Sequence, residues 1–132
     1  MAKILDASAL MVYLEKEEGY ADVQDLLIKA SETDKNLLMT TVNFGEVYYV
    51  VAREHGLEEA EKIFQLVQTF PIHFVEVDLL LAKQAAWLKA VFKLPFADCF
   101  AAALAKLRKG DLVTTDADFK VVEKEIKVIW LK

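Results

Sequence analysis

The segment Leu94–Ala105 reads LPFADCFAAALA and places a single carboxylate, that of Asp98, at the front of an otherwise apolar helix. Pro95 has a fixed φ and no N–H, which suits a helix entrance, and strong helix formers follow from Ala97, so we predict a helix that begins near Asp98. Because its turns are apolar on nearly every side, this helix should pack closely on a sheet or on other helices. A carboxylate at the edge of such a core is unfavourable unless it caps the helix, pairs with a cation or binds a metal.

Composition limits the class of protein. With 132 residues, of which 55% are hydrophobic and 28% charged, the sequence predicts a single globular domain over residues 1–132. Charged residues interrupt every long apolar run, so we expect a soluble protein without a membrane span. An aspartate within the first apolar segment disfavours a secretory signal, and the lone Cys99 excludes an internal disulfide, which together favour the cytoplasm. The formal net charge of −5 disfavours nucleic-acid binding by general electrostatic attraction.

Short apolar runs alternate with helical patterns along the chain. The runs expected to form strands are 3–6, 37–39, 72–77, 111–114 and 127–131. Between them, helical spacing predicts helices that include Ala7–Leu14, Val42–Arg53 and Leu79–Val91, the last capped by Asp78. This alternation indicates an α/β sandwich with a mostly parallel sheet.

Besides Asp98, three acidic residues are candidates for a site at the end of such a sheet. Asp6 follows the first strand, with Ser8 two residues later, and Asp116 follows the strand at 111–114. The carboxyl ends of parallel strands line the ligand crevice, although capping of the next helix explains Asp6 equally well. Glu46 lies on a helix among bulky apolar neighbours, with Asn43 one turn earlier on the same face.

Carboxylates that meet at one end of a sheet repel one another unless they share a cation. A ligand set made only of oxygen suits Mg²⁺ or Mn²⁺, which retain several waters and are completed by a substrate phosphate. Neither histidine nor Cys99 has the spacing of zinc ligands, and the sequence has no glycine-rich phosphate loop. We therefore expect a hard divalent cation and no nucleotide cofactor.

Four motifs in sequence carry a family resemblance. They are DASAL at 6–10, NFGE at 43–46, PFAD at 95–98 with the apolar helix that follows, and LVTTDADF at 112–119. Together they resemble the PIN-domain nucleases, in particular the VapC-type toxins, over essentially the whole chain. The resemblance implies a PIN-like three-layer sandwich with helices on both sides of the sheet. It also implies Mg²⁺- or Mn²⁺-dependent endoribonuclease activity on single-stranded or structured RNA, a homodimer, and a VapB-type antitoxin that occupies the site.

The resemblance also assigns roles to individual residues. The positions that match the acidic cluster of the family are Asp6, Glu46, Asp98 and Asp116. Ser8 and Thr114 match the hydroxyl positions that support this cluster, and Asn43 is a further supporting candidate. Asp118 competes with Asp116 for the fourth acidic position.

These assignments give a mechanistic hypothesis and one alternative. The three main acids would hold a divalent ion that activates water and neutralises charge on the scissile phosphate, and Asp116 would complete the ligand set. Three basic residues are candidate contacts for the RNA backbone: Arg53, Lys93 and Lys106. The alternative for each is the ordinary role of a surface cation, which is to keep the protein soluble. The alternative is a PIN-like scaffold that binds RNA or protein without cutting. A response-regulator receiver is disfavoured, because only Thr40 and Thr41 follow the central strand, where a receiver needs an aspartate.

Overall fold

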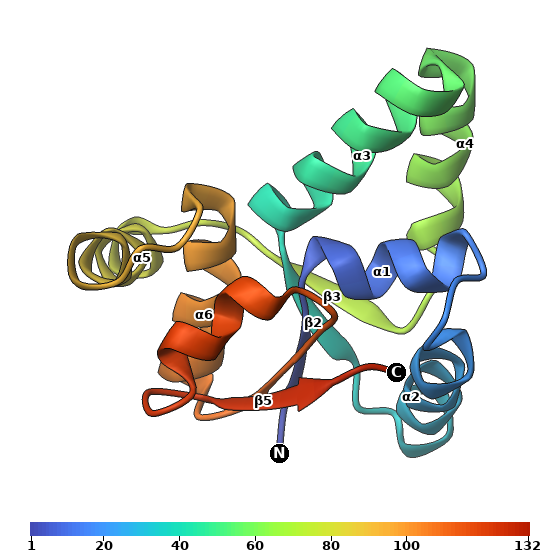
Figure 1. Cartoon of the computed structure of the whole chain (residues 1–132). Coiled ribbons are helices and arrows are strands. Elements are labelled where there is room, and N and C mark those ends of the chain that lie inside the picture. The colour runs from blue at the N-terminus through green and yellow to red at the C-terminus, as the bar shows by residue number, and fades with distance from the viewer.

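The computed structural model describes residues 1–132, and a five-stranded sheet runs through its centre (Figure 1). The strands are β1 (Lys3–Leu5), β2 (Leu37–Thr40), β3 (Ile72–Val75), β4 (Asp111–Thr114) and β5 (Lys127–Trp130). The helices are α1 (Ala7–Leu14), α2 (Tyr20–Thr33), α3 (Thr41–His55), α4 (Leu57–Val67), α5 (Leu79–Val91) and α6 (Phe96–Arg108), with a 3₁₀ helix, η1 (Ala117–Val122), after β4. None of these helices is long and apolar enough to cross a membrane.

The strand order is β3-β2-β1-β4-β5, and every neighbouring pair is parallel. The prediction of an α/β fold is confirmed, with the difference that the sheet is entirely rather than mostly parallel. The chain builds one half of the sheet outward from β1 and then returns to build the other half from β4. The order therefore reverses between β1 and β4, and in open α/β sheets this is the point where ligands bind, beyond the carboxyl ends of the strands.

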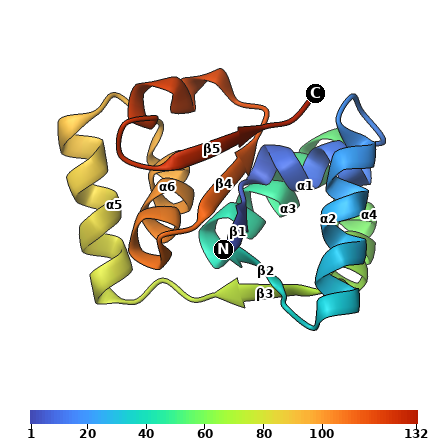
Figure 2. The ribbon, with the colours of Figure 1, turned by 90° about the horizontal axis from the view of Figure 1, so that it is seen from below.

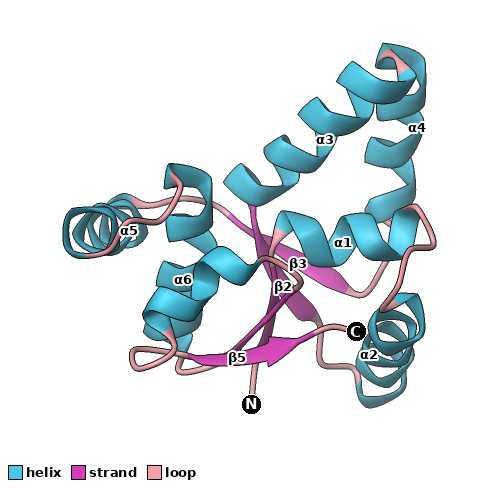
Figure 3. Cartoon of the chain, viewed as in Figure 1, coloured by secondary structure: helices cyan, strands magenta, loops and turns pink.

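Alternating side chains of the strands divide the core between two faces of the sheet. On β1, Ile4 packs with the cluster of α5 and α6, whereas Leu5 packs with the cluster of α1 to α4. Leu112 and Val113 of β4 divide in the same way. Figures 2 and 3 show the resulting layers, with helices on both sides of the strands and α3 and α4 extending away from the sheet. The three-layer arrangement follows from the two-residue period of buried strands.

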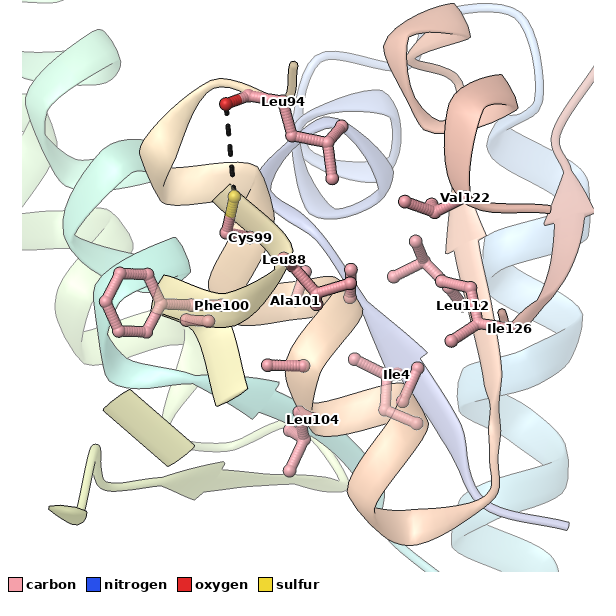
Figure 4. Close-up of a cluster of buried hydrophobic side chains, with 14 of the residues drawn as sticks. Ile4, Leu88, Leu94, Cys99, Phe100, Ala101, Leu104, Leu112, Val122 and Ile126 are labelled. Carbon is pink, nitrogen blue, oxygen red and sulfur yellow. Dashed lines mark hydrogen bonds between the residues drawn. The ribbon is translucent and has the colours of Figure 1, made fainter. Parts of the chain in front are cut away.

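Helix α6 is the buried centre of one of these clusters (Figure 4). Residues 98–105 are all buried, as the apolar pattern of this segment predicts. The helix begins at Phe96, two residues earlier than expected, because Pro95 occupies the N-cap position with φ −55° and ψ 144°. Asp98 therefore lies within the first turn and does not cap the helix with its side chain. Capping, the first of the three explanations for its carboxylate, is excluded.

The other helix boundaries follow from their caps. Helix α5 spans the predicted residues, and the Asp78 side chain accepts a hydrogen bond from the Leu81 N–H at 2.9 Å. Helix α3 begins one residue earlier and ends two residues later than expected, because the Thr40 side chain caps its first turn and Gly56, at φ 94°, ends it. Gly110 joins α6 to β4 where a Cβ would lie 2.6 Å from the Ala2 carbonyl oxygen, so only glycine fits there.

Candidate metal centre

Asp6 is the residue that joins β1 to α1 at the carboxyl edge of the sheet. Its Oδ1 accepts hydrogen bonds from the Ala9 N–H at 2.9 Å and the Ser8 hydroxyl at 2.8 Å, and its Oδ2 accepts one from the Thr114 hydroxyl at 2.5 Å. Burial raises the pKa of Asp6 to about 6 although these three donors oppose the rise, and the charge of Asp116 adds to it. Asp6 thus caps α1 and also lies within an acidic environment.

Ser8 and Thr114 connect the ends of β1 and β4. Their hydroxyl oxygens lie 3.1 Å apart, the Ser8 Oγ accepts the Thr115 N–H at 3.1 Å, and the Thr114 Oγ1 accepts the Asp116 N–H at 2.9 Å. The two hydroxyls therefore fix the side chain of Asp6 and the backbone that leads into Asp116. Both residues lie where the resemblance places supporting hydroxyl groups.

Glu46 is carried to the same region by α3. One turn before it, buried Asn43 accepts a hydrogen bond from the Thr40 hydroxyl at 2.5 Å and donates one to the Ala97 carbonyl at 3.1 Å. This link ties α3 to the first turn of α6. The Oε1 of Glu46 is buried and has no hydrogen-bond partner. Burial raises the pKa of Glu46, the Asn43 side chain opposes the rise, and the charge of Asp116 adds to it.

Asp98 lies among the other acids. The residue is only 6% exposed, and its Oδ2 is buried without a hydrogen-bond partner. Burial raises the pKa of Asp98 to about 8, and the charges of Asp116, Asp6 and Glu46 each add to the rise. The structure therefore brings together all four acids that the sequence singled out, although they are spread over 110 residues of chain.

Asp116 and Asp118 are both close to Asp98. Carboxylate oxygens of the three residues lie within 4.8 Å of one another. Asp116 caps η1, and its Oδ1 accepts the Asp118 N–H at 2.9 Å. Asp116 is half-buried and raises the pKa of the three main acids, whereas Asp118 is exposed and is not among the causes of those shifts. This geometry favours Asp116 for the fourth position and leaves Asp118 at the rim.

No basic side chain neutralises this cluster. The ion pairs of the protein join Lys3 to Asp111, His55 to Glu15 and Lys106 to Glu125, and none of them involves a member of the cluster. Buried carboxylate oxygens without donors are rare, because each one loses its hydration without compensation. Three such oxygens occur in the protein, and the one on Asp111 belongs to a carboxylate that is paired with Lys3 through its other oxygen. The other two, on Glu46 and Asp98, together with the mutual repulsion of the acids, fit a hard divalent cation with oxygen ligands such as Mg²⁺ or Mn²⁺.

Two parts of the site were missed at the sequence level. Thr40 holds Asn43 through two hydrogen bonds, because its Oγ1 also accepts the Asn43 N–H at 3.0 Å, and the Ala97 carbonyl receives the amide of Asn43. The role of Thr40 could have been predicted, because the spacing of Thr40 and Asn43 at the start of a helix is typical of an N-cap. The role of the Ala97 carbonyl depends on its contact with Asn43, which is 54 positions away, so no local sequence pattern predicts it.

A family model described as PIN domain matches residues 3–125 of this chain. The chain belongs to the PIN-domain family. A comparison with curated proteins gave no significant match. The match to the family model spans all four acids and the hydroxyl residues that support Asp6.

Solved structures of toxin–antitoxin systems share the fold of this PIN domain over its full length. VapBC2 from Rickettsia felis, solved with a DNA fragment from the promoter, aligns at a TM-score of 0.79 and 12% identity over 100% of both chains. DNA-bound VapBC from Salmonella typhimurium aligns at 0.75 and 13% identity, covering 98% of this chain and 97% of the other. VapC20 from Mycobacterium tuberculosis, described as a toxin that cleaves the sarcin–ricin loop, aligns at 0.66 and 18% identity, covering 92% and 95%. At these identities the likeness establishes the fold.

Proposed function

We propose that this PIN domain is a metal-dependent endoribonuclease and the VapC-type toxin of a toxin–antitoxin pair, acting in the cytoplasm. The observation that carries the proposal is the cluster of four acids with two buried carboxylate oxygens that have no donor and no basic partner. The family of nucleases to which the chain belongs supports it, as does the likeness to VapC20, itself described as a toxin that cleaves the sarcin–ricin loop.

The proposed roles follow from the contacts of each residue. Asp6, Glu46 and Asp98 hold Mg²⁺ or Mn²⁺, and Asp116 completes the ligand set. When bound, the divalent ion supplies activation of water and neutralisation of charge on the scissile phosphate. Ser8 and Thr114 hold Asp6 in position, Asn43 fixes the turn of α6 that carries Asp98, and Asp118 supports the rim of the cluster. No histidine is needed as a base in this scheme.

The proposed partners are single-stranded or structured RNA as substrate, a VapB-type antitoxin and a second copy of the chain. Several related structures were solved as VapBC complexes, among them those from Rickettsia felis and Salmonella typhimurium. Large apolar side chains exposed on this protein include Tyr49, Leu80, Trp87 and Val91, which leaves apolar surface for such contacts. Co-purification with the antitoxin and light scattering of the isolated protein test the two assemblies separately.

Cleavage of an end-labelled, single-stranded oligoribonucleotide tests the proposed activity. We expect cleavage with Mn²⁺, none with EDTA, and a loss of at least about 100-fold in the Asp98→Asn variant. The matched control is Asp25→Asn, which removes the same charge from an exposed position on α2 and should cut at the normal rate. Unchanged cleavage by Asp98→Asn would exclude the proposed role. RNA binding without cleavage would instead support a non-catalytic scaffold.

A further inference from the structure

A cavity adjoins the acidic cluster at the connection between α5 and α6. It is an open surface hollow with a volume of about 590 Å³. Its wall is formed by the end of α5 and the residues up to Pro95, and Asp118 closes the side nearest the cluster. Because the Asp118 carboxylate also lies within 4.8 Å of those of Asp98 and Asp116, the cavity and the cluster share one wall.

The wall of this cavity is held in place by two contacts to the Leu94 carbonyl. The Lys89 ammonium donates a hydrogen bond to the Leu94 carbonyl at 2.7 Å, and the Cys99 thiol donates a longer one to the same oxygen at 3.9 Å. The Leu94 side chain is fully buried in the α6 core (Figure 4). The connection is therefore anchored from both sides, and the cavity is formed before any ligand arrives.

The lining combines a free cation with exposed apolar surface. Lys93 is exposed and has no ion-pair partner, whereas the other candidate cations are engaged. Lys106 pairs with Glu125 at 2.9 Å, and Arg53 lies over the ring of Tyr49 at 5.2 Å. Val91, Phe92 and Pro95 supply the apolar part of the lining. Proteins bind nucleotides with this combination of groups: a cation contacts the phosphate, and apolar or aromatic side chains contact the base.

We infer that this cavity binds the nucleotide next to the scissile phosphate, with Lys93 contacting a phosphate of the RNA backbone and the apolar lining contacting its base. The inference rests on the proposed nuclease function, and it assigns the side of the cluster on which the strand lies. Because the protein has a net charge of −5, it does not attract RNA by its overall charge. A local cation beside the acidic cluster therefore supplies the contact that holds the substrate. Lys93 is thus a positioning residue for the substrate and not a catalytic residue.

The test compares Lys93→Ala and Lys93→Glu with the wild type in two assays, anisotropy of a labelled single-stranded oligoribonucleotide and its cleavage with Mn²⁺. The matched control is Lys29→Glu, since Lys29 lines a hollow at the amino ends of β1 and β2, the edge of the sheet opposite the cluster. We expect Lys93→Glu to weaken RNA binding about 10-fold at low salt and to raise KM by a similar factor, with kcat changed less than about 2-fold. Lys93→Ala should make the slope of log Kd against log salt shallower by about one, the loss of one phosphate contact.

Substrates shortened one nucleotide at a time separate a contact from a structural defect. Removal of the nucleotide that occupies the cavity should weaken wild-type binding but leave Lys93→Ala unaffected, because both changes remove the same interaction. Wild-type binding that does not depend on Lys93 overturns the inference, whether or not RNA is cut, and so does the absence of RNA binding. Binding that depends on Lys93 without any cleavage supports the cavity assignment while refuting the proposed nuclease.

Discussion

Replacement of Asp98 by asparagine should make the metal-free protein more stable at alkaline pH. The pKa of Asp98 is raised from 3.8 to about 8 in the folded protein, so between these values the folded state binds more protons than the unfolded state. The free energy of unfolding therefore falls as pH rises through this window. The stabilisation is fully present below about pH 4, declines progressively as the pH rises, and is completely lost above about pH 8, where Asp98 is ionised in the folded protein as well. The asparagine side chain of the variant does not titrate, so the stability of the variant should lack this component.

The size of the expected stability difference follows from how much of the Asp98 pKa shift lies within the pH range of the experiment. Between pH 6 and pH 9 about two pKa units are traversed, which corresponds to an upper limit of roughly 3 kcal/mol. Residual contact with solvent and relaxation of the carboxylate reduce this upper limit. We therefore expect the free energies of unfolding of wild type and variant to diverge by about 1–1.5 kcal/mol over this pH range. For a chain of this length that is roughly 3–6 °C in Tm.

Urea unfolding in EDTA at pH 6, 7, 8 and 9, followed by circular dichroism, measures the difference. The wild type should lose stability relative to Asp98→Asn as the pH rises, and the exposed-site control Asp25→Asn should follow the wild type. Parallel pH profiles for the wild type and Asp98→Asn would refute the reasoning, because they would mean that burial and the neighbouring charges do not raise the pKa of this carboxyl group in the folded protein.

Three further outcomes are expected. Thr114→Val leaves the Oδ2 of Asp6 without its donor and should lower the free energy of unfolding by about 1–3 kcal/mol together with RNA cleavage; a variant as stable and active as wild type would contradict the support role. Gly110→Ala should lower stability by about 1–3 kcal/mol through overlap with the Ala2 carbonyl while leaving the Mn²⁺ requirement of cleavage unchanged; unaltered denaturant midpoints would argue against the close approach. Mn²⁺ at about 100 times its Kd should stabilise the wild type by about 2.7 kcal/mol in thermal or urea unfolding, and the absence of any shift would oppose metal binding by the folded state.

Much of the fold was predictable because its signals are local. The alternation of short apolar runs with helical patterns predicts a parallel α/β sheet, and the cap at Asp78 sets the start of α5 where the structure has it. The start of α6 was misplaced, since Pro95 suits the first helical position and the cap position alike, and the local sequence does not distinguish them.

The candidate site was predictable in membership but not in geometry. Asp6, Asp98 and Asp116 each follow a strand or begin a helix, and a parallel sheet brings such positions to one edge. The prediction that Asp6 caps α1 is confirmed, because one oxygen of its carboxylate accepts the Ala9 N–H. The other oxygen accepts the Thr114 hydroxyl, and the charge of Asp116 acts on the same carboxylate, so a role in the acidic cluster stays a prediction that this geometry allows. The link from Asn43 to Ala97 depends on how α3 and α6 pack, which no local pattern encodes.

The central claim is that the four acids form one site for a hard divalent cation. Titration with Mn²⁺, monitored by the loss of its free-ion electron paramagnetic resonance signal, tests this directly for the wild type, Asp98→Asn and Asp25→Asn. The account predicts saturable binding by the wild type and the control, and an affinity at least about 10-fold weaker in Asp98→Asn. Equal affinity in all three proteins, or no saturable binding by the wild type, would contradict it.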